Sequence, residues 1–293
     1  MQLNAPEIRL KHVAAGEILE LLNAPRLEIF LKWLIEQELF VQYSIIPLYW
    51  SIVDTIDSIL KARAAAALLA VASQLKNDLY TLLRHDCDDT VDIFIRYRYP
   101  DVGPERRPAF VAELLDLLEH RRELLPQFNH MMLKGVLQIA EPLDALPYLE
   151  DETANVLVES CAPFYVQRLC LFKNSQHILG VEEIVKERIE RLSFTDRDRE
   201  LKHFAISHDE PGIQLSDIIV GILGKFLSFV CSSDDAGLMA ARRGLGEREQ
   251  RSLSLLNALL DRSVAETKAF EHYLLSLRDR EAAAFFLDPS VSP

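Results

Sequence analysis

The stretch Ile206–Phe226, ISHDEPGIQLSDIIVGILGKF, decides the expected fold of this chain. A polar loop, Ser207-His208-Asp209-Glu210, leads directly into an apolar helix that carries one acid, Asp217, in its first turn. A lone carboxylate on an apolar helix is costly to bury unless it has a partner. A divalent metal ion is one such partner, because hard cations prefer carboxylate oxygens. The alternative is that Asp217 caps or flanks the helix N-terminus, where negative charge is favoured.

The string GIQLSDIIVG in this helix resembles the C-terminal signature of the bacterial family called domain of unknown function 3800. Four further stretches agree with that family and follow in its order: EIRLKH at Glu7–His12, YSIIPLYWSIVDTIDSIL at Tyr43–Leu60, FNHMMLKGVLQ at Phe128–Gln138 and NSQHILGVEEIVKERI at Asn174–Ile189. The resemblance implies an α/β, helix-rich protein with a ribonuclease-H-like mixed sheet. It also implies a centre in which acids from separate strands and one helix hold Mg²⁺ or Mn²⁺.

The resemblance implies which residues of this sequence form that centre. Glu7 and Asp217 are its surviving acids, expected to lie close together as metal ligands and catalytic residues. Asp209 is the third expected ligand, and His208 is expected to help in catalysis, with His177 as an alternative helper. This sequence has no counterpart of the family's opening strand, which usually ends in Asp-Glu-Ser, and Asn174 stands where another strand often ends in an aspartate.

Without the opening strand, the expected sheet is incomplete. An open strand edge presents unpaired backbone groups to other chains. Either another segment of the chain, a second copy or a partner chain is therefore expected to cover that edge, or the opening strand lies upstream of this sequence.

Two functions follow from these observations. The first is a metal-dependent nuclease or phosphodiesterase of the ribonuclease-H-like class, acting on a nucleic acid through Glu7 and Asp217. The alternative is a non-catalytic helical interaction or scaffold protein on a degenerate nuclease fold, for example in phage defence. Because one acid of the centre is missing and Asn174 replaces another, we expect little nuclease activity.

Composition narrows the classes of partner. The chain of 293 residues is 49% hydrophobic and has a net charge of −13. Such an acidic surface repels phosphate backbones unless basic residues gather locally. Glycine-loop phosphate sites and the GxSxG hydrolase motif are absent from the sequence. The densest basic residues are Arg96, Arg98, Arg106, Arg107, Arg121 and Arg122.

The sequence predicts a soluble protein of the bacterial cytoplasm. The N-terminus lacks the apolar core of a signal peptide, and no uncharged apolar run is long enough to span a bilayer. The four cysteines are scattered and form no CxxC pair, which fits a reducing compartment.

We expect one domain over residues 1–293, with a helical insertion at about 49–160 and a C-terminal helical extension at about 233–293. Apolar periodicity predicts helices over Arg26–Gln37, Phe110–Arg122, Gln127–Ala140, Val181–Leu192, Ile213–Cys231 and Gly246–Leu277. β-branched and aromatic runs predict strands over Phe40–Pro47, Tyr165–Phe172 and Leu201–Ile206, with Glu7–Leu10 as a fourth. Pro100–Pro108 is expected to be a loop and Phe285–Pro293 a frayed tail.

Two other acidic stretches remain open at this point. Asp54 and Asp57 lie three residues apart, hence on one helical face. They are either a solvated edge or a wall of the acidic centre. Arg84–Asp92, RHDCDDTVD, lacks the glycine and glutamate spacing of a calcium loop and is expected to be a solvated turn or helix end.

Overall fold

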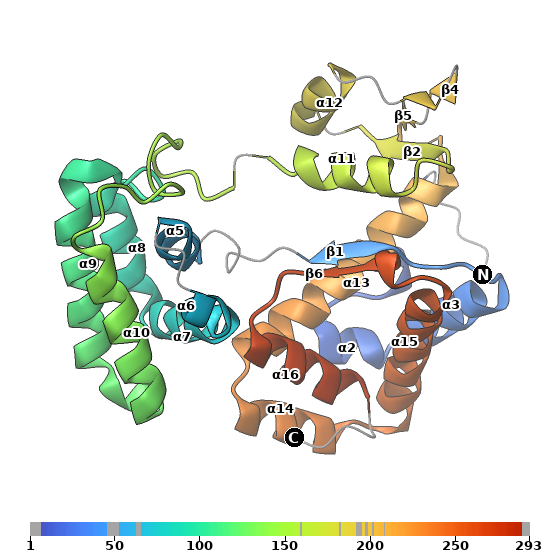
Figure 1. Ribbon diagram of the computed structural model, residues 1–293. Helices are drawn as coiled ribbons and strands as arrows, with labels where there is room; N and C mark the ends of the chain where they lie inside the picture. The colour runs from blue at the N-terminus through green and yellow to red at the C-terminus, as the bar shows by residue number, and fades with distance from the viewer. Residues whose placement is uncertain are drawn as a thin grey trace. The chain divides into compact units, whose positions relative to one another are not determined.

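The computed structural model describes residues 7–45, 53–62, 66–158, 160–181, 183–191, 195–196, 199–200, 202–207 and 209–288. The chain divides into two compact units (Figure 1). The first comprises Met1–Ser44, Ser160–Tyr273 and Asp279–Pro293, and the second Ile45–Glu159 and Leu274–Arg278. The second unit covers the insertion expected at about 49–160. The single ribonuclease-H-like domain over residues 1–293 stays a prediction.

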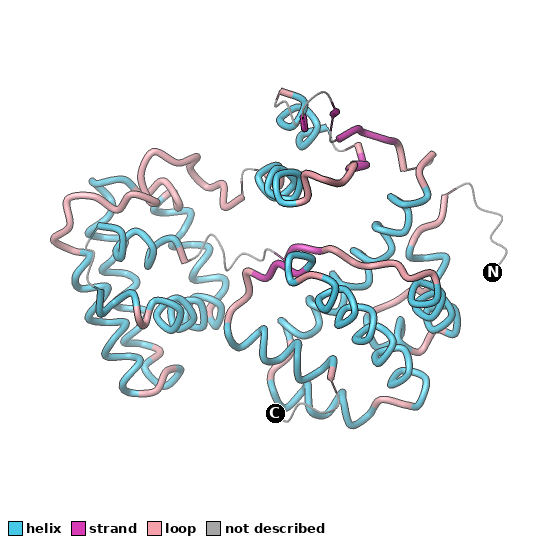
Figure 2. Tube along the Cα trace, turned by 45° about the vertical axis from the view of Figure 1, so that its right-hand side comes forward, coloured by secondary structure: helices cyan, strands magenta, loops and turns pink. Residues whose placement is uncertain are grey.

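The described part of the second unit is helical, as Figure 2 shows. Its helices are α5 (Asp54–Ala62), α6 (Ala66–Leu69), α7 (Ala72–His85), α8 (Cys87–Tyr97), α9 (Gly103–His120), the 3-10 turn η1 (Arg122–Leu124) and α10 (Gln127–Ala140). α10 packs against α5, α7 and α9. Leu79, Leu114 and Leu137, one from each of α7, α9 and α10, are fully buried in their shared core. The helix predicted over Gln127–Ala140 is therefore confirmed with its bounds.

The start of α9 differs from the prediction. Pro100–Pro108 was expected to be a loop, but the helix begins at Gly103 and contains Pro108. Pro104 lies in the first turn, where a missing N–H removes no helical hydrogen bond. The apolar face beyond it, including Phe110 and Leu118, is fully buried, and this burial stabilises the helix over its proline-rich first turns.

A buried ion pair holds the loop after α10 on α9. The Arg107 side chain is 10% exposed, and its Nη1 donates to Oε1 of Glu150 at 2.8 Å and to the Asp144 carbonyl at 3.1 Å. The same Glu150 oxygen accepts the Leu146 N–H at 3.0 Å. One arginine thus satisfies polar groups of a segment that has no helix or strand of its own.

The first unit contains most of the remaining helices: α1 (Leu10–Val13), α2 (Ile18–Leu22), α3 (Pro25–Glu36), α11 (Ala162–Leu171), α12 (Glu183–Glu190), α13 (Pro211–Ser232), α14 (Asp235–Gly244), α15 (Glu247–Glu266) and most of α16 (Leu277–Leu287). α13 packs against α1 and α2, and α15 packs against α2 and α3. Phe286 of α16 contacts the rings of Phe226 and Phe229 on α13, with centroids 6.3 and 5.2 Å apart.

The long C-terminal helix is shorter than predicted. The expected span Gly246–Leu277 ends as α15 at Glu266. Thr267 follows with its hydroxyl accepting the Ala269 N–H at 3.3 Å, which starts the 3-10 turn η2 (Lys268–Phe270) and then strand β6 (Glu271–Tyr273). The expected tail at Phe285–Pro293 is helical as far as Leu287, and residues 289–293 lie outside the described part.

The described strands form three separate pairs. β1 (Tyr43–Ile45) pairs with β6, and β3 (Thr195–Asp196) pairs antiparallel with β4 (Arg199–Glu200). β2 (His177–Gly180) runs parallel to β5 (Lys202–Ala205), with His177 opposite Lys202 and Gly180 opposite Ala205. The strands predicted over Phe40–Pro47 and Leu201–Ile206 are thus present, over shorter spans, as β1 and β5.

Two predicted strands are wrong. Tyr165–Phe172 belongs to helix α11, where Ala162 and Leu169, two turns apart, are buried against Val185 and Ile189 of α12. Glu7–Leu10 is not a strand, because Leu10 already begins α1. The helix-rich α/β class is confirmed, but the strands of the described residues pair only two by two.

One described helix, α13, is long and apolar enough to cross a membrane, with a mean hydropathy of 1.7 over its most apolar window. This is weak evidence for a span, since core helices of water-soluble proteins have the same length and composition. Asp217 and Lys225 also interrupt its sequence.

Candidate acidic centre

Helix α13 begins earlier than the sequence suggested, and this changes the position of Asp217. Glu210 is the N-cap and its side chain accepts the Gly212 N–H at 3.3 Å, while Pro211 occupies the first turn. Asp217 therefore lies beyond the first turn and caps nothing, so both the predicted first-turn position and its capping alternative are wrong. Its carboxylate projects from an exposed position next to the fully buried Ile218.

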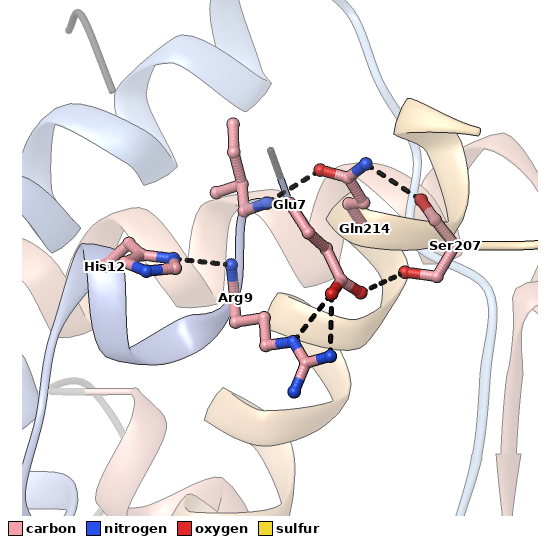
Figure 3. Close-up of polar contacts among 6 residues, drawn as sticks. Glu7, Arg9, His12, Ser207 and Gln214 are labelled. Atoms are coloured by element: carbon pink, nitrogen blue, oxygen red, sulfur yellow. Dashed lines mark hydrogen bonds and ion pairs between the residues drawn. The ribbon is translucent and has the colours of Figure 1, made fainter. Parts of the chain in front are cut away.

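Gln214 joins the N-terminal segment to the loop before α13 (Figure 3). Its side chain is almost buried; Oε1 accepts the Ile8 N–H at 2.8 Å and Nε2 donates to the Ser207 carbonyl at 2.8 Å. Close helix packing supports this join, because a Cβ on Gly221 would lie 2.8 Å from Cδ2 of Leu10. A larger residue at position 221 would therefore require the Leu10 side chain to move.

The same arrangement places Glu7 beside the loop. Its Oε2 accepts hydrogen bonds from Nη2 and Nε of Arg9 at 2.6 and 2.9 Å, and its Oε1 accepts from Oγ of Ser207 at 2.5 Å (Figure 3). Both carboxylate oxygens of Glu7 therefore already have charged or polar partners. The Glu7 side chain is 21% exposed, which strengthens these contacts relative to a fully solvated pair.

Glu7 and Asp217 lie close enough to interact electrostatically, although 210 positions separate them (217 − 7). Partial burial and then the negative charge of Glu7 raise the pKa of the Asp217 carboxyl, whereas Arg9 lowers it. In turn, the hydrogen bonds and charge of Glu7, and more weakly the charge of Asp217, raise the pKa of Arg9. The two expected acids are thus brought together, with one guanidinium acting on both.

The other expected site residues lie apart from this interaction or outside the description. Asp209 is exposed, and its backbone N–H donates to the Ile206 carbonyl at 3.0 Å. His208 lies outside the described residues. His177 begins β2, and its Nε2 lies 3.1 Å from the Phe172 carbonyl.

Asn174 is not at a strand end. It lies in the turn between α11 and β2, and the strand that precedes helix α12 ends at Gly180 instead. The predicted position of a lost aspartate at Asn174 is therefore wrong. The segment still contains a strand followed by a helix, but the strand begins at His177.

The donor set of this centre does not fit Mg²⁺ or Mn²⁺ as it stands. No three side chains among the described His, Cys, Asp and Glu residues converge to hold one ion. Glu7 would have to leave Arg9 and Ser207 before it could bind a metal. The Arg9 guanidinium, paired with Glu7, also supplies positive charge beside that carboxylate.

The remaining acidic stretches have local partners in the second unit. Asp57 pairs with Lys76 at 2.6 Å. Burial, then Asp57 and Glu152, raise the pKa of Asp54 to about 7, and Lys76 opposes them. In the Arg84–Asp92 stretch, Asp86 pairs with Arg121 and immediately precedes α8, as expected of a helix end.

Three participants were not predicted from the sequence: Arg9, Ser207 as a side-chain donor, and Gln214. Arg9 lies two positions from Glu7, and Gln214 lies three positions before Asp217, so both were adjacent to predicted residues. The basic residue Arg9, two positions from an expected metal ligand, was the sequence feature that could have indicated an ion pair at Glu7.

Comparison with known proteins does not add to this assignment. No family model matches the chain, and neither a curated protein nor a solved structure matches it significantly.

Proposed function

We propose that this chain is a non-catalytic interaction protein built on a degenerate ribonuclease-H-like framework, in which the acidic centre has become a structural junction. One observation carries the proposal: both oxygens of Glu7 are occupied, by Arg9 and by Ser207. The junction ties the N-terminal segment to α13 and the loop before it through two hydrogen bonds, from Ser207 Oγ to Glu7 and from the Ile8 N–H to Gln214. Arg9 compensates the negative charge of Glu7, so the carboxylate needs no metal ion to be stable in this position.

The partner we propose is an extended segment of another chain, or of a second copy, added at an edge of the β2–β5 sheet. Among the described residues β2 and β5 pair only with each other, so one edge of each strand has no described strand beside it, and parallel sheets are normally covered on both faces. β2 carries no charge apart from its histidine, and Ile178 at its centre is 42% exposed. Strand addition at such an edge is a common mode of peptide recognition.

We place this interaction in the cytoplasm. All four cysteines are described, and each is a free thiol. Three of them are exposed, a state that a reducing compartment preserves.

The second candidate is the metal-dependent nuclease. It is favoured by the electrostatic contact between Glu7 and Asp217, two acids from distant parts of the chain. In that case Mg²⁺ or Mn²⁺ would bind the two carboxylates after Arg9 has moved away, and Asp209 would complete the set. A nucleic acid phosphodiester would be the substrate.

One set of measurements separates the two functions. Melting temperature and nucleic-acid cleavage are measured for the wild type, Glu7→Gln, Arg9→Gln and Asp217→Asn, each with and without Mn²⁺. If the centre is a junction, wild type gives no cleavage and no Mn²⁺-specific shift. Glu7→Gln and Arg9→Gln each melt at a lower temperature than the wild type without metal, because a partner of the ion pair is lost. Asp217→Asn is unchanged or more stable, because a repelling charge is removed.

The exposed acid Asp116 in the second unit gives the matched control, Asp116→Asn, for nonspecific metal effects. Mn²⁺-dependent cleavage by the wild type that disappears in Asp217→Asn but survives in Asp116→Asn would establish the nuclease and overturn the junction.

A further inference from the structure

Arg168 on α11 extends toward the segment before β6. Its Nη1 donates to the Ala269 carbonyl at 2.8 Å, and its Nη2 makes only a long contact of 3.4 Å with Oε1 of Gln167. Its Nε is buried and has no hydrogen-bond acceptor within the described part of the chain. Among the described residues, the Nε of Arg168 thus lacks a hydrogen-bond acceptor and its Nη2 has only a distant one.

No carboxylate balances this cation. Among the described residues Arg168 forms no ion pair, and burial alone lowers its pKa. The contrast with Arg9, Arg121 and Arg251 is clear, since in each of these a neighbouring acid raises the pKa. A partly desolvated charge without a counter-charge is costly, particularly in a chain with 45 acidic and 32 basic residues.

His272, the central residue of β6, follows three residues after Ala269, whose carbonyl accepts the Arg168 hydrogen bond. Its Nδ1 is buried without a partner within the described chain. Burial, and then the positive charge of Arg168, lower the pKa of His272. The Arg168 guanidinium is thus held on the segment that leads to His272, the two groups interact electrostatically, and each keeps a buried nitrogen without a partner among the described residues.

The nearest acid of β6 is engaged with other groups. Glu271 accepts a hydrogen bond from Oη of Tyr43 at 2.9 Å, and that hydroxyl also lies 2.8 Å from Oη of Tyr273. Successive strand residues point to opposite faces, so Glu271 and Tyr273 share one face and His272 takes the other. Alternation thus keeps the Glu271 carboxylate away from Arg168.

We propose that Arg168 and His272 form a binding site for an oxyanion, a phosphate or carboxylate group. The guanidinium supplies charge and paired N–H donors that suit such oxygens, and the imidazole supplies a further donor from a second direction. The site lies in the first unit and does not depend on the junction at Glu7.

The test uses the full chain at pH 7. Inorganic phosphate and acetate are titrated by calorimetry, each against sodium chloride at matched ionic strength. We expect saturable binding of phosphate, acetate or both beyond the chloride reference, and the stronger of the two identifies the oxyanion. We expect Arg168→Gln to weaken binding by about tenfold or more and His272→Gln by a smaller factor.

Arg262→Gln is the matched control. The Arg262 guanidinium also has a buried Nε without a partner among the described residues and donates to carbonyls, that of Ile35 among them, but it lies over the Phe40 ring. Its replacement should leave oxyanion binding unchanged. In the wild type, binding should strengthen as pH falls toward 5.5, because His272 gains a proton, and His272→Gln should remove that dependence.

Two results would overturn the proposal. One is that neither anion binds more tightly than chloride. The other is that binding persists at full strength in Arg168→Gln. If circular dichroism shows that Arg168→Gln does not fold, Arg168→Lys replaces it, because lysine keeps the charge and removes the planar guanidinium. Undiminished binding by Arg168→Lys, together with an unaltered pH profile in His272→Gln, would also overturn the proposal.

Discussion

The helical core of the second unit contains many more buried side chains than the small core beneath the β2–β5 sheet. The first contains fully buried side chains from several helices, among them Leu79, Leu114 and Leu137. The second is described by four buried residues: Ala162, Leu169, Val185 and Ile189. Buried apolar area sets local stability, so the two regions should open with very different free energies. We expect the smaller core beneath β2 and β5 to open at the lower free energy of the two.

The largest expected effect tests the deep core. Leu114→Ala should lower the free energy of unfolding by about 2 to 5 kcal/mol, since it leaves a cavity among fully buried neighbours. Leu169→Ala, equally buried, should cost about 1 to 2 kcal/mol, mainly as faster hydrogen exchange in α11 and β2. Urea denaturation and exchange rates measure both. Equal global losses for the two leucines would show that the cores form one cooperative structure.

An intermediate effect is expected at the buried ion pair. Arg107→Ala should cost about 2 to 4 kcal/mol, because it leaves Glu150 without its cation and the Asp144 carbonyl without a donor. The control is Arg96→Ala, which removes an exposed pair with Glu113 and should cost less than about 1 kcal/mol. Similar losses in denaturant midpoint would mean that burial does not distinguish these two pairs.

The smallest effect concerns pH. Burial and neighbouring acids raise the pKa of Asp54 from 3.8 to about 7 in the folded protein. The folded state therefore binds the proton more tightly than the unfolded state, and stability falls as pH rises from about 4 through 7. Asp54→Asn should flatten this slope and stabilise the protein at pH 8 by about 1 kcal/mol, after allowance for solvent screening.

The control for Asp54→Asn is Asp57→Asn. It breaks the pair with Lys76 and should not stabilise the protein. An unchanged pH profile of the melting temperature in Asp54→Asn would show that this carboxyl ionises normally.

Sequence periodicity predicted the helices best where one face is deeply buried. Gln127–Ala140 is such a case, since Leu133 and Leu137 recur at a helical step. It failed at Tyr165–Phe172, where aromatic and branched residues suggested a strand. Pro163 starts a helix there, and packing of Leu169 against Ile189 outweighs β-propensity. Thr267 was missed as a breaker, because a local side-chain hydrogen bond is not visible in hydrophobic periodicity.

The acidic centre was foreseen only in part. Proximity of Glu7 and Asp217 followed from the family resemblance and not from any spacing in the sequence. The role of Arg9 could not be predicted, because a nearby arginine stabilises a carboxylate whether or not a metal binds. The role of Gln214 could not be predicted either, because its amide bridges Ile8 and Ser207 only when the fold brings these two residues to either side of it.

The two hydrogen bonds of Gln214 also have a consequence for the order of folding. Ile8 and Gln214 are 206 positions apart, and the whole of the helical insertion lies between them. Closing so long a loop loses chain entropy before the contacts that offset this loss can form, so such contacts form late in folding. Substitutions at Gln214 should therefore speed unfolding while leaving the refolding rate nearly unchanged. Ile8, near the beginning of the sequence, would then be among the last residues to reach its native contacts.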